Sequence, residues 1–156
     1  MATAQEKLGL ASINGDEAAA RKAVVEDGAD PNKAVFMPDG TMGGPCTAAY
    51  VAATHGHHGV LNVLLAAPVS ADPDKGDTSD GETPCHAACR TDRPDAVAVL
   101  IEHGADPNRA DKGCGETPCM KAARYGSTAG LRALAEGAAR QDGRALEVNA
   151  VALHVN

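Results

Sequence analysis

Cysteine and histidine are the residues of this sequence whose types and spacing could do chemistry. Cys85, His86 and Cys89 lie close together, and Cys114 and Cys119 follow further along the chain. A zinc site needs about four nitrogen or sulfur ligands that converge on one point. Accessible thiols of lowered pKa could instead react with oxidants. One hypothesis is therefore a thiol- or metal-responsive sensor that uses Cys85, Cys89 and Cys114.

A second group of possible ligands is formed by His55, His57 and His58. The sequence contains no phosphate-binding loop, nucleophile elbow, zinc-protease motif or dinucleotide-binding motif. Paired acids such as Asp72 and Asp74 fall in predicted turns, where a solvated role is expected. We therefore expect no catalytic activity and no cofactor. An enzyme of unrecognised type would need a convergent pocket.

The elements that must position these residues repeat along the chain. Gly81-Glu-Thr-Pro-Cys85 recurs in the same order as Gly115-Glu-Thr-Pro-Cys119. Gly104-Ala-Asp-Pro-Asn108 is preceded by the identical segment Gly28-Ala-Asp-Pro-Asn32. A repeat period in the thirties is typical of proteins that stack small helical units on one another.

The unit at residues 81–112 predicts a helix, a turn, a second helix and a hairpin. Thr83 is a favourable N-cap and Pro84 a favourable first helical residue, so a short helix should run to about Thr91. Pro94 begins the second helix, on which apolar residues recur at helical spacing.

These residues resemble the ankyrin repeat, a unit of about 33 residues with the signature Thr-Pro-Leu-His-x-Ala. Thr83-Pro-Cys-His-Ala-Ala88 matches that signature, and the resemblance covers nearly the whole chain. It implies an all-α solenoid of helix-turn-helix repeats with projecting β-hairpin loops. We expect a single domain over residues 1–156, with approximate repeats at 4–36, 44–78, 81–112 and 115–150 and a degenerate C-terminal cap or tail at 140–156.

The other units depart from the signature. The first has no Thr-Pro before its helix, which suits a terminal cap with a polar outer face. The second needs about three extra residues between Pro45 and Gly56, which predicts a first helix longer by nearly one turn. In the fourth, Met120 replaces the histidine. The connections at residues 33–44 and 74–82 predict a long first hairpin and an acidic second one.

The resemblance implies structural roles for most cysteines and histidines. Cys46, Cys85 and Cys119 would each follow a helix-starting proline, where the family has a core leucine. Stacked helices lie about 8–10 Å apart, so equivalent cysteines are too distant for easy disulfide bonding. His86 would bond neighbouring backbone, and His57 would lie in the turn between paired helices. Buried core thiols are the favoured interpretation, with the sensor as the alternative.

Composition limits the partners and the compartment. The 156 residues include 21 acids and 14 bases, a net charge of −7, which disfavours binding to nucleic acid. The sequence predicts neither a membrane span nor a secretory signal, so we expect no membrane insertion. Five cysteines, an odd number, favour the cytoplasm or another reducing compartment, with the nucleus or an organelle interior left open.

The resemblance makes the exposed surface the expected place of function. Ankyrin-like proteins bind other proteins through hairpin tips and the concave side of the first helices. The chain would then be a non-catalytic interaction module or an assembly (scaffold) subunit. The matching concave positions, unit by unit, are Val51, Thr54 and His55; Ala87, Arg90 and Thr91; and Lys121, Arg124 and Tyr125.

Arg90 and Arg124 lie one period apart and should stack, with Lys121 beside them. They are either merely solvated or form a basic strip for an acidic segment of a partner, such as a subunit of a larger complex, with Tyr125 as an anchor. The hairpin candidates for partner binding are Phe36, Met37, Asp39, Asp77 and Lys112, of which Phe36 and Met37 could instead pack back on the stack.

The final residues form a segment of nearly alternating apolar side chains, which predicts extended structure. These residues are Leu146, Val148, Val151, Leu153 and Val155. The segment could close the last repeat or add a strand to a partner's sheet.

Overall fold

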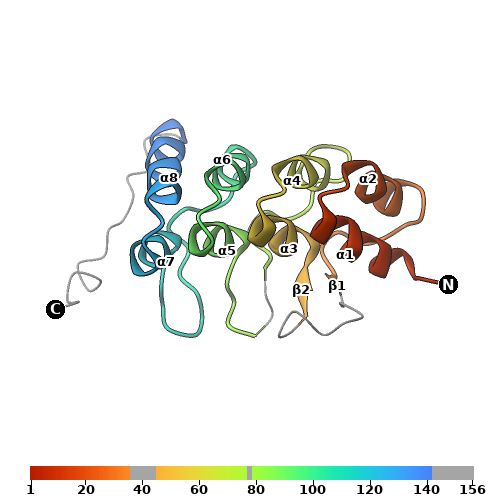
Figure 1. Cartoon of the computed structure of the whole chain (residues 1–156), viewed down its shortest axis with the longest axis horizontal. Helices are drawn as coiled ribbons and strands as arrows, with labels where there is room; N and C mark the ends of the chain where they lie inside the picture. Colours follow the sequence, from red (N-terminus) through yellow and green to blue (C-terminus); the bar gives the residue numbers. More distant parts are fainter. Residues whose placement is uncertain (36–44, 77–78, 142–156) are drawn as a thin grey trace.

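The structure is a computed structural model that describes residues 1–35, 45–76 and 79–141. Over these residues, eight helices stack in two layers, as Figure 1 shows. The inner layer contains α1 (Ala4–Asn14), α3 (Ala48–His55), α5 (Pro84–Arg90) and α7 (Pro118–Tyr125). The outer layer contains α2 (Glu17–Val25), α4 (His58–Leu65), α6 (Pro94–Glu102) and α8 (Thr128–Arg140). The predicted all-α solenoid of helix pairs is confirmed.

A threonine begins each inner helix because its hydroxyl accepts a hydrogen bond from a backbone N–H of the first turn. The four N-caps are Thr3, Thr47, Thr83 and Thr117. In α1 the side chain of Glu6 bonds back to the N-cap N–H, which completes a capping box. The first unit therefore needs no proline to start its helix.

The prediction of a lengthened first helix in the second unit is wrong. Helix α3 has 8 residues, as many as α7, and its N-cap is Thr47. The preceding residue, Cys46, pairs with Val35 in the small antiparallel sheet of β1 (Ala34–Val35) and β2 (Cys46–Thr47). The extra residues therefore lie before the helix, because a threonine offers a cap that Pro45 cannot.

This shift changes which residues are equivalent. Cys46 is buried, but it precedes α3 and does not occupy the core position of Cys85. Counted from the N-cap, that position belongs to Ala49, which is also buried. The longer inner helix is α1, with 11 residues.

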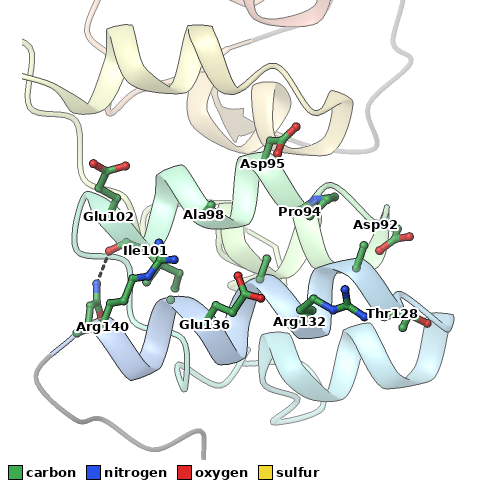
Figure 2. A pocket seen from close by; sticks show the side chains of 14 residues that line it. Asp92, Pro94, Asp95, Ala98, Ile101, Glu102, Thr128, Arg132, Glu136 and Arg140 are labelled. Atoms are coloured by element: carbon green, nitrogen blue, oxygen red, sulfur yellow. Dashed lines mark hydrogen bonds between the residues drawn. The ribbon is translucent and has the colours of Figure 1, made fainter.

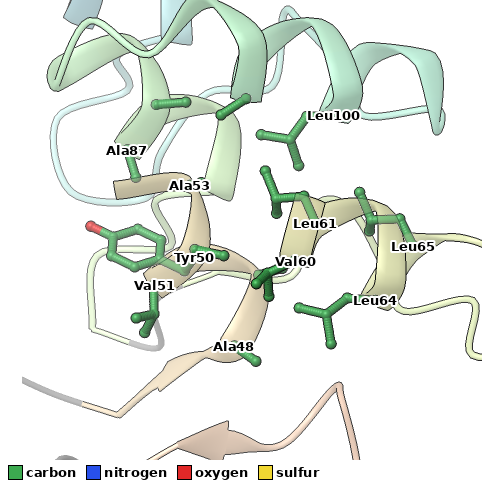
Figure 3. Packing of buried hydrophobic residues seen from close by; sticks show 14 of the residues in the cluster. Ala48, Tyr50, Val51, Ala53, Val60, Leu61, Leu64, Leu65, Ala87 and Leu100 are labelled. Carbon is green, nitrogen blue, oxygen red and sulfur yellow. The ribbon is translucent and has the colours of Figure 1, made fainter. Parts of the chain in front are cut away.

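The core lies between the two layers and consists of small and aliphatic side chains. Figure 3 shows Leu61 of α4 close to Leu100 of α6, with Leu64 on the other side of α4 and Ala53 and Ala87 on the inner helices. All five side chains are fully buried. Because alanine keeps the backbones close together, the stack packs tightly with few aromatic residues.

The turns that follow the outer helices are joined from one repeat to the next. In each turn an aspartate accepts a hydrogen bond from the backbone N–H two residues later: Asp30 from Asn32, Asp72 from Asp74, and Asp106 from Asn108. The Asn32 side chain also accepts from the N–H of Asp72, at 2.8 Å. The Asp74 carboxylate accepts from the N–H of Asp106, at 3.0 Å. Side chains of one turn thus fix the backbone of the next.

Candidate functional site

Lys121 is the centre of an ion-pair cluster on the side of the inner helices that carries the hairpins. Its Nζ lies 2.8 Å from Glu82 Oε1, 2.9 Å from Glu116 Oε2 and 3.3 Å from Asp111 Oδ2. Burial alone would lower the pKa of Lys121, but the hydrogen bonds to Glu82 and Glu116 outweigh burial and raise the pKa well above its ordinary value. Glu82 precedes α5, whereas Asp111 and Glu116 precede α7, so Lys121 connects two successive hairpins.

Glu82 also anchors the neighbouring part of the cluster. The Tyr50 hydroxyl donates to Glu82 Oε2 at 2.9 Å, and Arg90 Nη2 donates to that hydroxyl at 3.2 Å. Burial would raise the pKa of Glu82, but the hydrogen bonds from Lys121 and Tyr50 hold the pKa below its ordinary value. Burial and the adjacent Glu82 charge raise the pKa of Tyr50. Glu82 is therefore ionised and Tyr50 protonated at neutral pH.

Asp111 shapes the hairpin before α7. One of its carboxylate oxygens accepts from the N–H groups of Cys114, Gly115 and Glu116, at 2.8, 2.8 and 3.3 Å. Burial would raise the pKa of Asp111, but the Cys114 N–H and the Lys121 ammonium outweigh burial and lower the pKa. The same carboxylate therefore holds the hairpin backbone and one side of the Lys121 cluster.

Arg124 lies at the open end of the cluster, and Tyr125 follows it as the last residue of α7. Arg124 Nη1 lies 3.1 Å from the Glu116 carboxylate, and the Arg124 side chain is 57% exposed. Tyr125 is also 57% exposed. These two side chains present a guanidinium and an aromatic ring to solvent beside a fixed cluster of charges.

The basic strip differs from the prediction. Arg90, Lys121 and Arg124 do lie together, but Glu82, Asp111 and Glu116 balance their charge, so the strip carries no excess of positive charge. Lys121 is only 8% exposed. The sequence-based prediction missed the three carboxylates, although Glu82 and Glu116 occupy the same place in successive repeats, each directly before a cap threonine.

The other predicted concave positions divide into buried and accessible ones. Val51 and Ala87 are fully buried and do not reach the surface, which corrects their prediction as concave contacts. Thr54 and Thr91 are half-buried, and their hydroxyls donate to carbonyls one turn earlier in their helices. His55 is exposed.

The hairpin candidates are only partly covered by the structure. Lys112 is exposed, and its backbone N–H donates to the carbonyl of Asp80 at 2.7 Å, which joins the second and third hairpins. The predicted contacts Phe36, Met37, Asp39 and Asp77 lie outside the described residues, as does the C-terminal segment at 142–156.

His86 and His57 form hydrogen bonds to backbone groups. His86 Nδ1 accepts from the Thr83 N–H at 3.1 Å, so the neutral ring carries its proton on Nε2, which donates to the Glu116 carbonyl at 2.8 Å. Burial lowers the pKa of His86 and keeps the ring neutral. His57 Nε2 lies 2.7 Å from the carbonyl of Ile13 and so connects the first two helix pairs. The expected structural role of His86 is confirmed.

The cysteines are mostly core residues. Cys85 and Cys89 are fully buried, and Cys119 nearly so. A hydrogen bond with the Cys89 thiol and burial raise the pKa of Cys85, which keeps it protonated and unreactive. Cys114 is exposed within the third hairpin. Among the described residues, no three side chains of His, Cys, Asp or Glu are grouped to hold a metal ion.

A groove of about 820 Å³ lies between α6 and α8, in the outer layer (Figure 2). Its floor includes Ala98, Ile101 and Gly137, and its rims carry charged side chains of both signs. A Cβ at position 137 would lie 2.8 Å from Ile101 Cγ2, so glycine is what lets α8 approach α6 here. No motif in the sequence pointed to this groove.

Comparison with known proteins agrees with this architecture. Residues 8–111 match the family model of ankyrin repeats, with three copies. No curated protein matches the chain. Within the described residues, no helix is long and apolar enough to cross a membrane. The repeated Thr-capped helix pairs and a family match over about two thirds of the sequence show that the chain belongs to the ankyrin repeat family.

Proposed function

We propose that the chain is a non-catalytic binding module that holds a segment of another protein against the open side of α5 and α7. Ankyrin repeat domains are generally protein-binding modules. The observation that carries the proposal is the pair Arg124 and Tyr125 at the end of α7, both more than half exposed, with Arg124 held by its ion pair to Glu116 of the Lys121 cluster. Tyrosine and arginine are among the side chains that most often dominate binding energy at protein interfaces.

The balanced charges define the kind of partner segment. A run of acids would meet Glu82 and Glu116 as well as the cations, so a simple acidic segment is a poor match. We expect a segment that offers hydrogen-bond acceptors to Arg124 and an apolar group to Tyr125. Because the face has little net charge, binding should depend only weakly on ionic strength.

The sensor hypothesis has less support. It needs accessible thiolates or grouped ligands, whereas Cys85 and Cys89 are buried and the pKa of Cys85 is raised. Cys114 is accessible, but a single exposed thiol on a hairpin does not by itself make a sensor.

The test begins with cross-linking mass spectrometry on complexes captured with the full chain, which identifies the partner and the contact residues. The affinity of that partner is then measured for a variant carrying Arg124→Ala and Tyr125→Ala. We expect binding to weaken by about tenfold or more, because both side chains contact the partner and neither supports the core.

A matched control carries Arg21→Ala and Val25→Ala on α2. These residues are also an exposed cation and an exposed large side chain, but they lie on the outer layer. The control should bind like the unchanged chain. Full binding by the Arg124/Tyr125 variant, or loss of binding by the control alone, would contradict the proposed face.

A further inference from the structure

The groove between α6 and α8 lies where side chains form a bridge in the preceding repeat. Between α4 and α6, His103 Nε2 lies 3.3 Å from Asn62 Oδ1, so these two side chains connect neighbouring outer helices. Counted from the N-caps of the outer helices, the equivalent residues one repeat later are Ala98 and Gly137. Both line the groove. The space is therefore open because two small residues replace the bridging pair.

The floor of the groove is apolar and low. On α8 the lining residues Ala129, Ala133 and Gly137 recur every four positions, a spacing that puts them on one side of the helix. Ala98 lines the groove from α6 and is exposed (Figure 2). The distance between packed helices depends on the side chains at their contact, so a floor of this kind permits the close approach of a further helix.

The rims of the groove carry charges that are not used within the described chain. Asp95 and Glu102 lie on α6, and Arg132, Glu136 and Arg140 lie on α8. All five are exposed. Over residues 1–35, 45–76 and 79–141, none of the five forms an ion pair. In contrast to the Lys121 cluster, these charges are available to a partner.

The order of these charges has the spacing of a helix. Asp95 and Glu102 are seven positions apart, which is two helical turns or about 10 Å along α6. Arg132, Glu136 and Arg140 follow one another every four positions along α8. The α6 rim is therefore purely acidic, whereas the α8 rim is mixed and mainly basic.

We propose that this groove holds an amphipathic helix of another protein. The apolar stripe of the helix packs on the small residues of the floor. Basic side chains two turns apart on one flank pair with Asp95 and Glu102, because residues seven positions apart lie on the same side of a helix. A helix also satisfies its own backbone N–H and C=O groups, which an apolar floor cannot do for an extended segment.

A second copy of the chain is a poorer occupant. Two grooves that face each other are both concave, so neither floor would be filled. The charge order of the α8 rim is symmetric about Glu136, so an antiparallel contact between two α8 rims would place Arg132 opposite Arg140 and Glu136 opposite its own copy. Such a juxtaposition of like charges opposes association.

This site is separate from the proposed binding face. The groove is lined by residues of α6, α8 and the segments next to them, and by none of α5 or α7. The proposal therefore does not rest on the proposed function. The Arg124→Ala and Tyr125→Ala variant should keep the groove's affinity for a helix, so the two proposals can fail separately.

The test uses the full chain and two designed helices as probes. Each probe is a stapled peptide of about 14 residues, or four turns, with one leucine stripe, because short unstapled peptides are marginally helical in water. The lysine probe carries two lysines seven positions apart beside the stripe, and its twin carries glutamates there. Fluorescence anisotropy should give a Kd about tenfold lower for the lysine probe, because attraction to the α6 rim becomes repulsion in the twin.

Variants of the chain locate the binding. Ala98→Lys fills the floor at an exposed position and should weaken binding of the lysine probe by about tenfold. Asp95→Lys combined with Glu102→Lys should reverse the order of the two probes. The matched control combines Glu17→Lys with Glu26→Lys, the same charge change on exposed acids at the two ends of α2, and should leave that order unchanged. Circular dichroism checks that every variant is folded.

Nuclear magnetic resonance of the full chain distinguishes the possible occupants. Shift changes at Ala98, Ala133 and Gly137 on addition of the lysine probe support the proposal. Equal affinity for the two probes, shift changes centred on α5 and α7, or no binding would contradict it. A dimer that Ala98→Lys dissociates would assign the groove to a second copy. Nuclear Overhauser effects between the groove and residues 142–156 in the free chain would assign it to the chain itself. Either of these last two results would also overturn the proposal.

Discussion

At the scale of single residues, Lys121 decides the charge of the surface that we propose as the binding face. The position of Lys121 in the sequence suggested a free basic side chain. In the structure its ammonium group forms ion pairs with three carboxylates, and the residue is buried. Glu82 and Glu116 in turn bond to Arg90, Tyr50 and Arg124. The charges of the cluster are therefore largely satisfied within the chain, and Glu116 of the cluster holds Arg124 through an ion pair.

Replacing Lys121 with methionine tests this role. Lys121→Met keeps the volume of the side chain but leaves three carboxylates without their common cation, so we expect a loss of about 2 kcal/mol in the free energy of unfolding at pH 7. Chemical denaturation measures the loss. As a control, Lys7→Met removes the cation of the exposed pair with Asp27 and should cost much less. Equal losses in the two variants would mean that the cluster is not cooperative.

At the scale of elements, the threonine caps and the turns set the repeat. Each inner helix begins at a threonine, and this rule places α3 correctly where alignment on Pro45 did not. The turns after the outer helices share one equivalent position, which is occupied by Asn32, Asp74 and Asn108 in the three successive turns. Asp74 is half-buried there, and desolvation raises its pKa even though Arg109 lies 3.7 Å away.

This raised pKa predicts the effect of two substitutions. Asp74→Asn keeps the acceptor for the Asp106 N–H and removes a partly buried charge, so it should leave the stability unchanged or raise it at pH 7. Because a raised carboxyl pKa costs stability only where the group is ionised, any gain should vanish as the pH falls below about 4. Asp74→Ala removes the acceptor as well and should cost about 1 kcal/mol. A loss with asparagine as large as with alanine would show that the negative charge itself is needed. Urea denaturation at two pH values measures both variants.

At the scale of the whole molecule, the stack is held by contacts that cross from one repeat to the next. His57 bonds to the first pair, Asn32 and Asp74 bond to following turns, and Lys121 joins two hairpins. Loss of any one of these contacts should therefore lower the stability of the neighbouring repeat as well as its own.

The cross-repeat cluster also predicts how the stack responds to acid. The folded-state pKa values of Glu82 and Asp111 are lowered, so their contribution to stability is complete above their ordinary values of 4.5 and 3.8 and is lost as the pH falls through the lowered ones. Thermal unfolding followed by circular dichroism should show Tm falling below about pH 5. Lys121→Met should show a shallower fall, so that its difference from the unchanged chain narrows with acidification. Parallel curves for the two proteins would contradict this assignment.

The sequence alone determined the period, the helix pairs and the core. These features arise from local chemistry, because a cap hydroxyl, a proline at the first helical position and apolar spacing act within a few residues. The period also identified His86, Cys85 and Cys119 as structural. Only the tertiary structure decided the state of the predicted binding strip. Glu82, Asp111 and Lys121 are brought together by the packing of successive hairpins, and whether a charge is free or paired depends on distances that no local pattern encodes.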